Sequence, residues 1–329
     1  MRSVVADKMG RSLASIGWRL PLASLIAPHQ PVVLIYHSVP RVGDGDSVDA
    51  AVFERHVVFL KEHFQFISPL EMGIRRPRSH RTEVLLTFDD GMRNNFDVVW
   101  PILSKHGVPA LFFVSSRHAE PGRYLWFAYL RALKKYYPHD RLAFHGTHID
   151  MRPAVREESV TRLTNALLDL KPHPAAMYRA IEKKLPPLEE FMTPQQLRDE
   201  CEGMRAEEIA ALGKSALFTV GCHTVDHPFL SRCEPREMRR QIEENKRWLE
   251  AVSGVRCDAI AYPAGDYNTD VLGFCRELAF SQGYAVAASV RSVPELEIPR
   301  VGIYSASLEF LGFKVRWGNL LRAARVSFG

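Results

Sequence analysis

Two histidines four residues apart and a pair of adjacent aspartates are the side chains of this sequence most suited to chemistry. His223 and His227 follow an apolar segment, and on one helical turn their spacing would place both rings on one face. Asp89 and Asp90 also follow an apolar segment, where adjacent carboxylates repel unless a positive charge or a shared proton compensates. Two imidazoles and one carboxylate are a common ligand set for a divalent metal. The pattern predicts a metal site, with helix capping as the alternative role of the aspartates.

Short apolar segments that alternate with helical patterns must position these residues. Helical spacing is expected at about 96–105, 235–252 and 269–281, and strands are expected at 32–36, 84–88, 110–114, 217–221, 259–262 and 284–288. This alternation predicts an α/β fold with a parallel sheet or barrel, whose functional residues lie on the loops after the strands.

The pattern changes between about residues 120 and 205, which are polar, helical and poor in strands. This segment is interpreted as a helical insertion in a single domain of residues 31–329. Trp126, Phe127 and Tyr129 have two interpretations, as part of an aromatic lid over the predicted metal site or as the core of a helix. If the insertion is a lid, its removal should change substrate preference and leave metal binding intact.

Residues 87–91 (Thr-Phe-Asp-Asp-Gly) and 223–228 (His-Thr-Val-Asp-His-Pro) resemble the first two signature motifs of the polysaccharide deacetylase family, also called NodB-homology or carbohydrate esterase 4. The resemblance implies a distorted (β/α)7 barrel of NodB-homology type. It implies Asp89 as the catalytic base and Asp90, His223 and His227 as ligands of one divalent metal ion. Zinc is the expected metal, with cobalt, nickel or iron as alternatives.

Residues 262–266 (Tyr-Pro-Ala-Gly-Asp) resemble the third motif of that family, which implies that the backbone N–H of Ala264 binds the oxyanion. Two departures stand out. Ala261 occupies the place of the arginine that orients the base, and residues 296–300 lack the late histidine that serves as general acid. Arg300 is the candidate replacement for the missing arginine, with an ordinary surface arginine as the alternative.

An early Tyr-His-Ser-Val segment at residues 36–39 is similar to the first motif of a branch of the family that deacetylates exopolysaccharides. In that branch the histidine is taken as the acid, so His37 is assigned this role, against a structural histidine at a strand end. The expected function is removal of the N-acetyl group from an N-acetylated sugar or polysaccharide by metal-activated water. The alternative is a catalytically silent carbohydrate-binding protein that retains the metal. A phosphohydrolase of the haloacid dehalogenase type is disfavoured, because residues 89–93 do not supply Asp-x-Asp-x-Thr.

Composition limits the remaining function classes. The formal net charge of +5 is too small to indicate nucleic-acid binding. The five cysteines contain no Cys-x-x-Cys pair, so neither a disulfide framework nor a zinc ribbon is indicated. Residues 1–30 form an N-terminal extension without a clear signal peptide or transmembrane helix, which favours a cytoplasmic protein. An amphipathic helix there, with the basic and apolar segment 313–328, is the basis for expecting peripheral membrane contact.

Overall fold

The computed structural model describes residues 30–43, 48–74, 81–144, 146–170, 174–286 and 294–323, with side chains described through residue 318. The expected N-terminal extension therefore lies outside the described residues, apart from Gln30. The C-terminal segment is described as far as helix α12 (Leu308–Ala323) extends. Within the described ranges, no helix combines the length and the apolar character needed to cross a bilayer.

Seven parallel strands of the described chain close into a ring. The ring order is β1, β10, β9, β8, β7, β4 and β3, and β3 pairs again with β1. The ring is uneven, because β7 and β8 share a single residue pair whereas β1 and β3 share five. The predicted distorted (β/α)7 barrel is confirmed, and one further strand, β2, pairs with β3 outside the ring. The strands are β1 (Val32–Tyr36), β2 (Gln65–Phe66), β3 (Glu83–Phe88), β4 (Ala110–Val114), β7 (Phe218–Cys222), β8 (Ala259–Ala261), β9 (Gln282–Ala285) and β10 (Ile298–Gly302).

Successive residues of each strand face opposite sides of the barrel wall. Val33 and Leu85 pack in a cluster made mainly of strand residues, which fills the barrel interior. Leu34 and Leu86 pack instead against the surrounding helices. Because both faces of the sheet are covered, the strands read as continuous apolar runs, and polar side chains appear where the strands end. The helices around the barrel are α3 (Ala50–His63), α4 (Trp100–His106), α9 (Ala206–Gly213), α10 (Pro235–Ser253), α11 (Thr269–Glu277) and α12.

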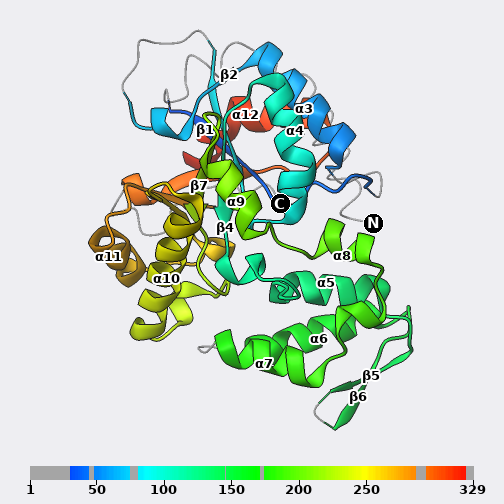
Figure 1. Cartoon of the computed structure of the whole chain (residues 1–329). Helices are drawn as coiled ribbons and strands as arrows, with labels where there is room; N and C mark the ends of the chain where they lie inside the picture. The colour runs from blue at the N-terminus through cyan, green and yellow to red at the C-terminus, as the bar shows by residue number, and fades with distance from the viewer. Residues whose placement is uncertain are drawn as a thin grey trace.

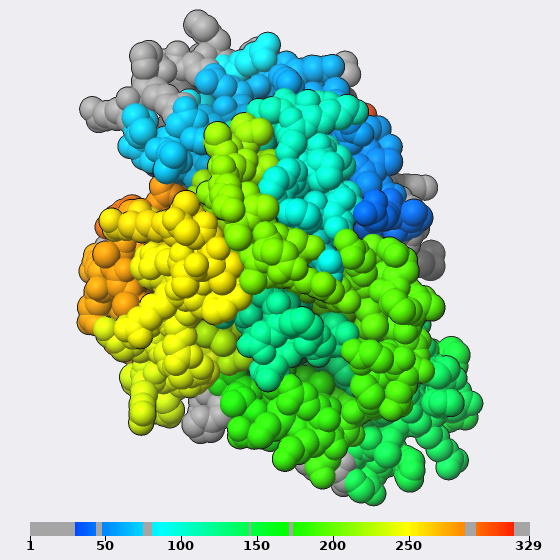
Figure 2. Space-filling model, viewed as in Figure 1, coloured from blue at the N-terminus to red at the C-terminus, as the bar shows by residue number. Residues whose placement is uncertain are grey.

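Between β4 and β7 the chain leaves the barrel and forms a body with a hydrophobic cluster of its own, whose buried members all fall within residues 126–201. This body is the lower green part of the molecule in Figures 1 and 2. Its antiparallel hairpin β5–β6 was not expected, because each strand has only four residues and Leu142 is the only one of these residues that is buried. Its elements are α5 (Trp126–Tyr136), β5 (Arg141–Phe144), β6 (Thr147–Asp150), α6 (Arg156–Leu168), α7 (Pro174–Lys184) and α8 (Pro194–Glu200).

Candidate metal centre

The two aspartates lie on a tight turn directly after β3. The N–H of Asp89 donates to the carbonyl of Tyr36, which continues the pairing of β3 with β1. Asp90 and Gly91 both have a φ of 73°, in the left-handed region that glycine adopts most easily. A Cβ on Gly91 would lie 2.8 Å from Cγ1 of Val114, so close approach also requires glycine there. The turn gives the two carboxylates different partners.

Capping does not explain the aspartates. The π-helical segment that follows (Asn95–Val99) has Asn94 at its N-cap, and the hydrogen bonds of the Asp89 carboxylate go to Arg300. The capping alternative is therefore wrong.

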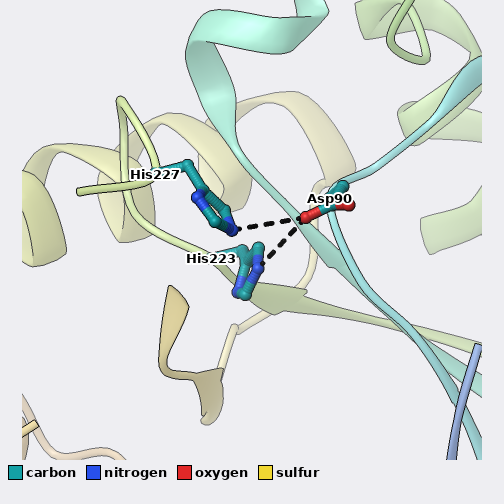
Figure 3. Close-up of side chains that lie close together, drawn as sticks. All are labelled: Asp90, His223 and His227. Atoms are coloured by element: carbon teal, nitrogen blue, oxygen red, sulfur yellow. Dashed lines mark ion pairs between the residues drawn. The ribbon is translucent and has the colours of Figure 1, made fainter. Parts of the chain in front are cut away.

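Asp90, His223 and His227 each present one ligand atom, and these atoms all lie within 4.8 Å of one another (Figure 3). Nε2 of His223 lies 3.5 Å and Nε2 of His227 lies 3.4 Å from the same Oδ1 of Asp90. The three side chains are less than a tenth exposed. Two imidazole nitrogens and one carboxylate oxygen that converge in this way could hold a metal ion.

The two histidines lie in the loop after β7 and not on a helical turn, so the expected helical geometry is wrong. Thr224 and His227 have φ values of 66° and 51°. The Oγ1 of Thr224 accepts a hydrogen bond from the N–H of His227, at 3.1 Å. Two left-handed residues, and not helical periodicity, bring both Nε2 atoms to Asp90.

His223 is oriented by groups outside the ligand set. Its Nδ1 donates to the carbonyl of Ala261 at 2.8 Å, which leaves Nε2 as the ring nitrogen that faces Asp90. Its backbone N–H donates to Oδ1 of Asn245 on α10, at 3.0 Å. Ala261, at the position of the missing family arginine, thus contributes its carbonyl.

Burial and proximity set the charges of the three ligands. Burial alone would raise the pKa of Asp90, but the contact with His223 and the neighbouring His37 outweigh it and hold that pKa below its usual range. Burial lowers the pKa of His227 to about 4. Burial also acts to lower the pKa of His223, but Asp90 and Asp89 outweigh it and raise that pKa. An ionised carboxylate and a neutral His227 at neutral pH are the forms that bind a metal.

Asp89 is paired with a different partner. Nη1 and Nη2 of Arg300 donate to its two carboxylate oxygens at 2.6 and 2.8 Å, and Nη1 also contacts Oγ1 of Thr87 at 3.2 Å. The Arg300 side chain is 0% exposed and that of Asp89 is 6% exposed. Burial would raise the pKa of Asp89, but Arg300 and His223 outweigh this effect and lower it. Asp89 is therefore an ionised carboxylate next to the three candidate ligands.

A cleft of about 710 Å³ opens beside the candidate ligands. The barrel side of the cleft includes His37, Ala264 and Tyr304, and the insertion side includes Trp126 and Phe127. The ring of His37 stacks on the ring of Tyr304 with centroids 6.0 Å apart. Ala264 has a φ of 53°, on the loop after β8. His37, Asp90, His227 and Ala264 line this cleft, and Asp89, His223 and Arg300 lie behind it. Six of these seven predicted residues follow a barrel strand, whereas Arg300 lies in the middle of β10.

Sequence reasoning missed some of the cleft. β10, which carries Arg300, was not expected as a strand, because its sequence Ile-Pro-Arg-Val-Gly lacks an apolar run. Tyr304 follows that strand and was therefore also missed. Trp126 and Phe127 line the cleft, whereas Tyr129 is in the core of the insertion and donates to the carbonyl of Pro186.

Comparison with known proteins agrees with this geometry. Residues 76–283, more than half of the chain, match the polysaccharide deacetylase family. The chain belongs to that family. This family member is 31% identical over 260 residues to YxkH of Bacillus subtilis (strain 168), which is provisionally named as a polysaccharide deacetylase. The match covers 78% of the chain but 64% of YxkH, so the chain spans less than two thirds of that relative.

Solved structures share the fold of this polysaccharide deacetylase family member. IcaB from Ammonifex degensii superposes with a TM-score of 0.56 at 19% identity, covering 88% of this chain and 98% of IcaB. The Streptococcus pyogenes deacetylase PplD, solved in complex with acetate, has a TM-score of 0.54 at 18% identity, covering 86% of this chain and 98% of PplD. At these identities the likeness establishes the fold.

Proposed function

We propose that this protein is a metal-dependent N-deacetylase that acts on an N-acetylated sugar unit, within a polysaccharide or a lipid-linked precursor. The observation that carries the proposal is that the two adjacent aspartates have different partners. Arg300 pairs with Asp89, while Asp90 faces His223 and His227. One carboxylate is thus available to move a proton and the other to hold a metal.

Asp90, His223 and His227 would hold the metal, and zinc suits two imidazoles and a carboxylate. When bound, such an ion acts as a Lewis acid toward the acetamide carbonyl and lowers the pKa of water. Residues of the chain would supply proton transfer and stabilisation of the oxyanion. Asp89, ionised because of Arg300, accepts the proton of the attacking water, and the N–H of Ala264 donates to the oxyanion.

His37 is proposed as the acid that protonates the leaving amine. It lines the cleft with Asp90 and Ala264, and its charge would help to keep Asp89 and Asp90 ionised. The products are acetate and a free amino sugar. A carboxylate directly behind the cleft, Asp89, and an imidazole that lines it, His37, support base and acid roles for separate groups.

The experiment is acetate release from a panel of N-acetylated oligosaccharides by protein stripped of metal and reloaded with zinc or cobalt. Release that depends on metal and is abolished in Asp89→Asn is the expected result. Asp97→Asn is the matched control, because the Asp97 side chain is also only 10% exposed and is ion-paired with Arg198, but does not line the cleft. Absence of acetate from every substrate, with one metal ion still bound, would favour the carbohydrate-binding alternative, and released phosphate would indicate a phosphohydrolase.

A further inference from the structure

The insertion contacts the backbone of the loop that carries the two candidate histidine ligands. Nε1 of Trp126, at the start of α5, donates to the carbonyl of His227 at 3.2 Å. The hydroxyl of Tyr178, on α7, donates to the carbonyl of Asp226 at 2.9 Å. Trp126 and Tyr178 are 9% and 3% exposed, and all four groups are buried. Two consecutive carbonyls next to the metal site are therefore held from the insertion and not from the barrel.

The two histidines differ in how their rings are held. Nδ1 of His223 donates to a barrel carbonyl, that of Ala261. Nδ1 of His227 is buried and has no hydrogen-bond partner among the described residues. A histidine ligand normally has its second nitrogen hydrogen-bonded, which fixes the ring orientation. For His227 another source of orientation is needed.

Phe127 of the insertion packs on the ring that lacks this hydrogen bond. Its ring meets that of His227 in a T-shaped contact with centroids 4.9 Å apart. The backbone of His227 is left-handed, with a φ of 51°, a conformation that persists only when its surroundings hold it. The contacts of Trp126 and Phe127 meet this need, because they hold the backbone and the ring.

Tyr178 is itself held in place. The guanidinium of Arg117 lies 3.8 Å from the centroid of its ring and 3.5 Å from the carboxylate of Asp226. Arg117 also pairs with Glu182, one turn further along α7. Tyr178 of the insertion is thus joined to the histidine loop in two ways. It donates a hydrogen bond to Asp226, and its ring makes a cation–π contact with Arg117, which is itself ion-paired with Asp226.

We infer that Trp126, Phe127 and Tyr178 are positioning residues for His227, so that the insertion is part of the metal centre. This inference rests on the metal site of the proposed function but not on its reaction. It differs from the expectation for a simple lid, because removal of the insertion would not leave metal binding intact.

The test compares two hydroxyl deletions in the full-length chain. Tyr178→Phe removes the donor to Asp226. Tyr129→Phe is the matched control, because it removes another hydroxyl of the insertion core, which donates to the carbonyl of Pro186 at 2.6 Å. Metal dissociation constants for zinc and cobalt are measured by chelator competition, together with the cobalt absorption spectrum and the thermal unfolding of the metal-free proteins.

The expected result is that Tyr178→Phe weakens metal binding by roughly tenfold or more, with a changed cobalt spectrum, while Tyr129→Phe binds metal like the wild type. Trp126→Phe, which keeps an aromatic ring but lacks the N–H, should behave like Tyr178→Phe. Equal metal affinity in Tyr178→Phe and the wild type, or an equal loss in Tyr129→Phe, overturns the inference and leaves the proposed function standing. A wild-type protein that binds no metal overturns both the inference and the proposed function.

Discussion

The guanidinium of Arg300 forms two parallel hydrogen bonds to the carboxylate of Asp89, at 2.6 and 2.8 Å, and both side chains are almost fully buried. This geometry fixes the plane of the carboxylate as well as its charge. It also gives Asp89 the positively charged partner that the family resemblance indicated was missing, because Ala261 occupies the position of the family's arginine. Arg300 arrives from β10, which is separated from β8 by β9.

Replacing Arg300 should therefore impair the base. Arg300→Gln leaves Asp89 buried without its counter-charge, and kcat/KM should fall by about 100-fold or more. Because Arg300 lowers the pKa of Asp89, its loss should move the acidic limb of the pH–rate profile to higher pH. The pH dependence of acetate release measures this shift. Arg93→Gln, which removes another buried arginine whose ion-pair partners, Glu202 and Glu208, are not among the predicted site residues, should leave the limb unchanged. An unmoved limb in Arg300→Gln would refute the assignment.

Metal removal should lower the stability of the native protein. At a free metal concentration about 100 times the dissociation constant, binding stabilises the folded state by about 2.7 kcal/mol. The melting temperature measured by calorimetry should therefore fall when zinc is removed by a chelator. In Asp90→Asn the difference between the two conditions should disappear, because one ligand is lost. A chelator effect of equal size in Asp90→Asn would place the metal elsewhere.

His37→Ala should slow the reaction at the step that protonates the amine. The expected loss is about 100-fold in kcat on an N-acetyl substrate, with metal affinity unchanged. An O-acetyl substrate with a phenolate leaving group needs no such proton, so its hydrolysis should be affected much less. Parallel rate measurements on the two substrates decide the matter, and equal losses on both would indicate that His37 has another role.

The stability of the protein at acidic pH should depend on His56. This histidine is fully buried on α3, where its Nδ1 contacts the hydroxyl of Tyr36 at 3.1 Å, and burial lowers its pKa from 6.5 to about 4. Between these two pH values the unfolded chain takes up a proton that the folded chain does not. The contribution of His56 should therefore reduce stability as the pH falls from 6.5 to 4, and this contribution should not change further below 4.

Each pKa unit is worth about 1.4 kcal/mol, so the loss from His56 is on the order of 3 kcal/mol. Urea unfolding of the wild type and of His56→Gln across this range provides the measurement. The variant should be less stable at pH 7 and should lose less stability on acidification. Equal slopes for the two proteins would assign the acid sensitivity to other groups.

The sequence by itself determined a parallel α/β arrangement and the identity of the central residues, and the family resemblance implied a barrel in place of an open sheet. Strands buried on both faces are continuous apolar runs, and the first polar residues after them must lie at one end of the barrel. For this reason Asp89, Asp90, His223 and His227 could be named from their types and positions. The family motifs then suggested a task for each.

Only the tertiary structure decided how these residues are held. The partner of Asp89 comes from residue 300, and the carbonyl of His227 is held by Trp126, 101 residues away along the chain. The histidine loop uses left-handed residues where a helical turn was expected, because backbone conformation in a loop follows from its contacts more than from spacing. Local patterns report which residues are buried and which are polar. Pairings between distant segments depend on strand order and packing, which no local pattern contains.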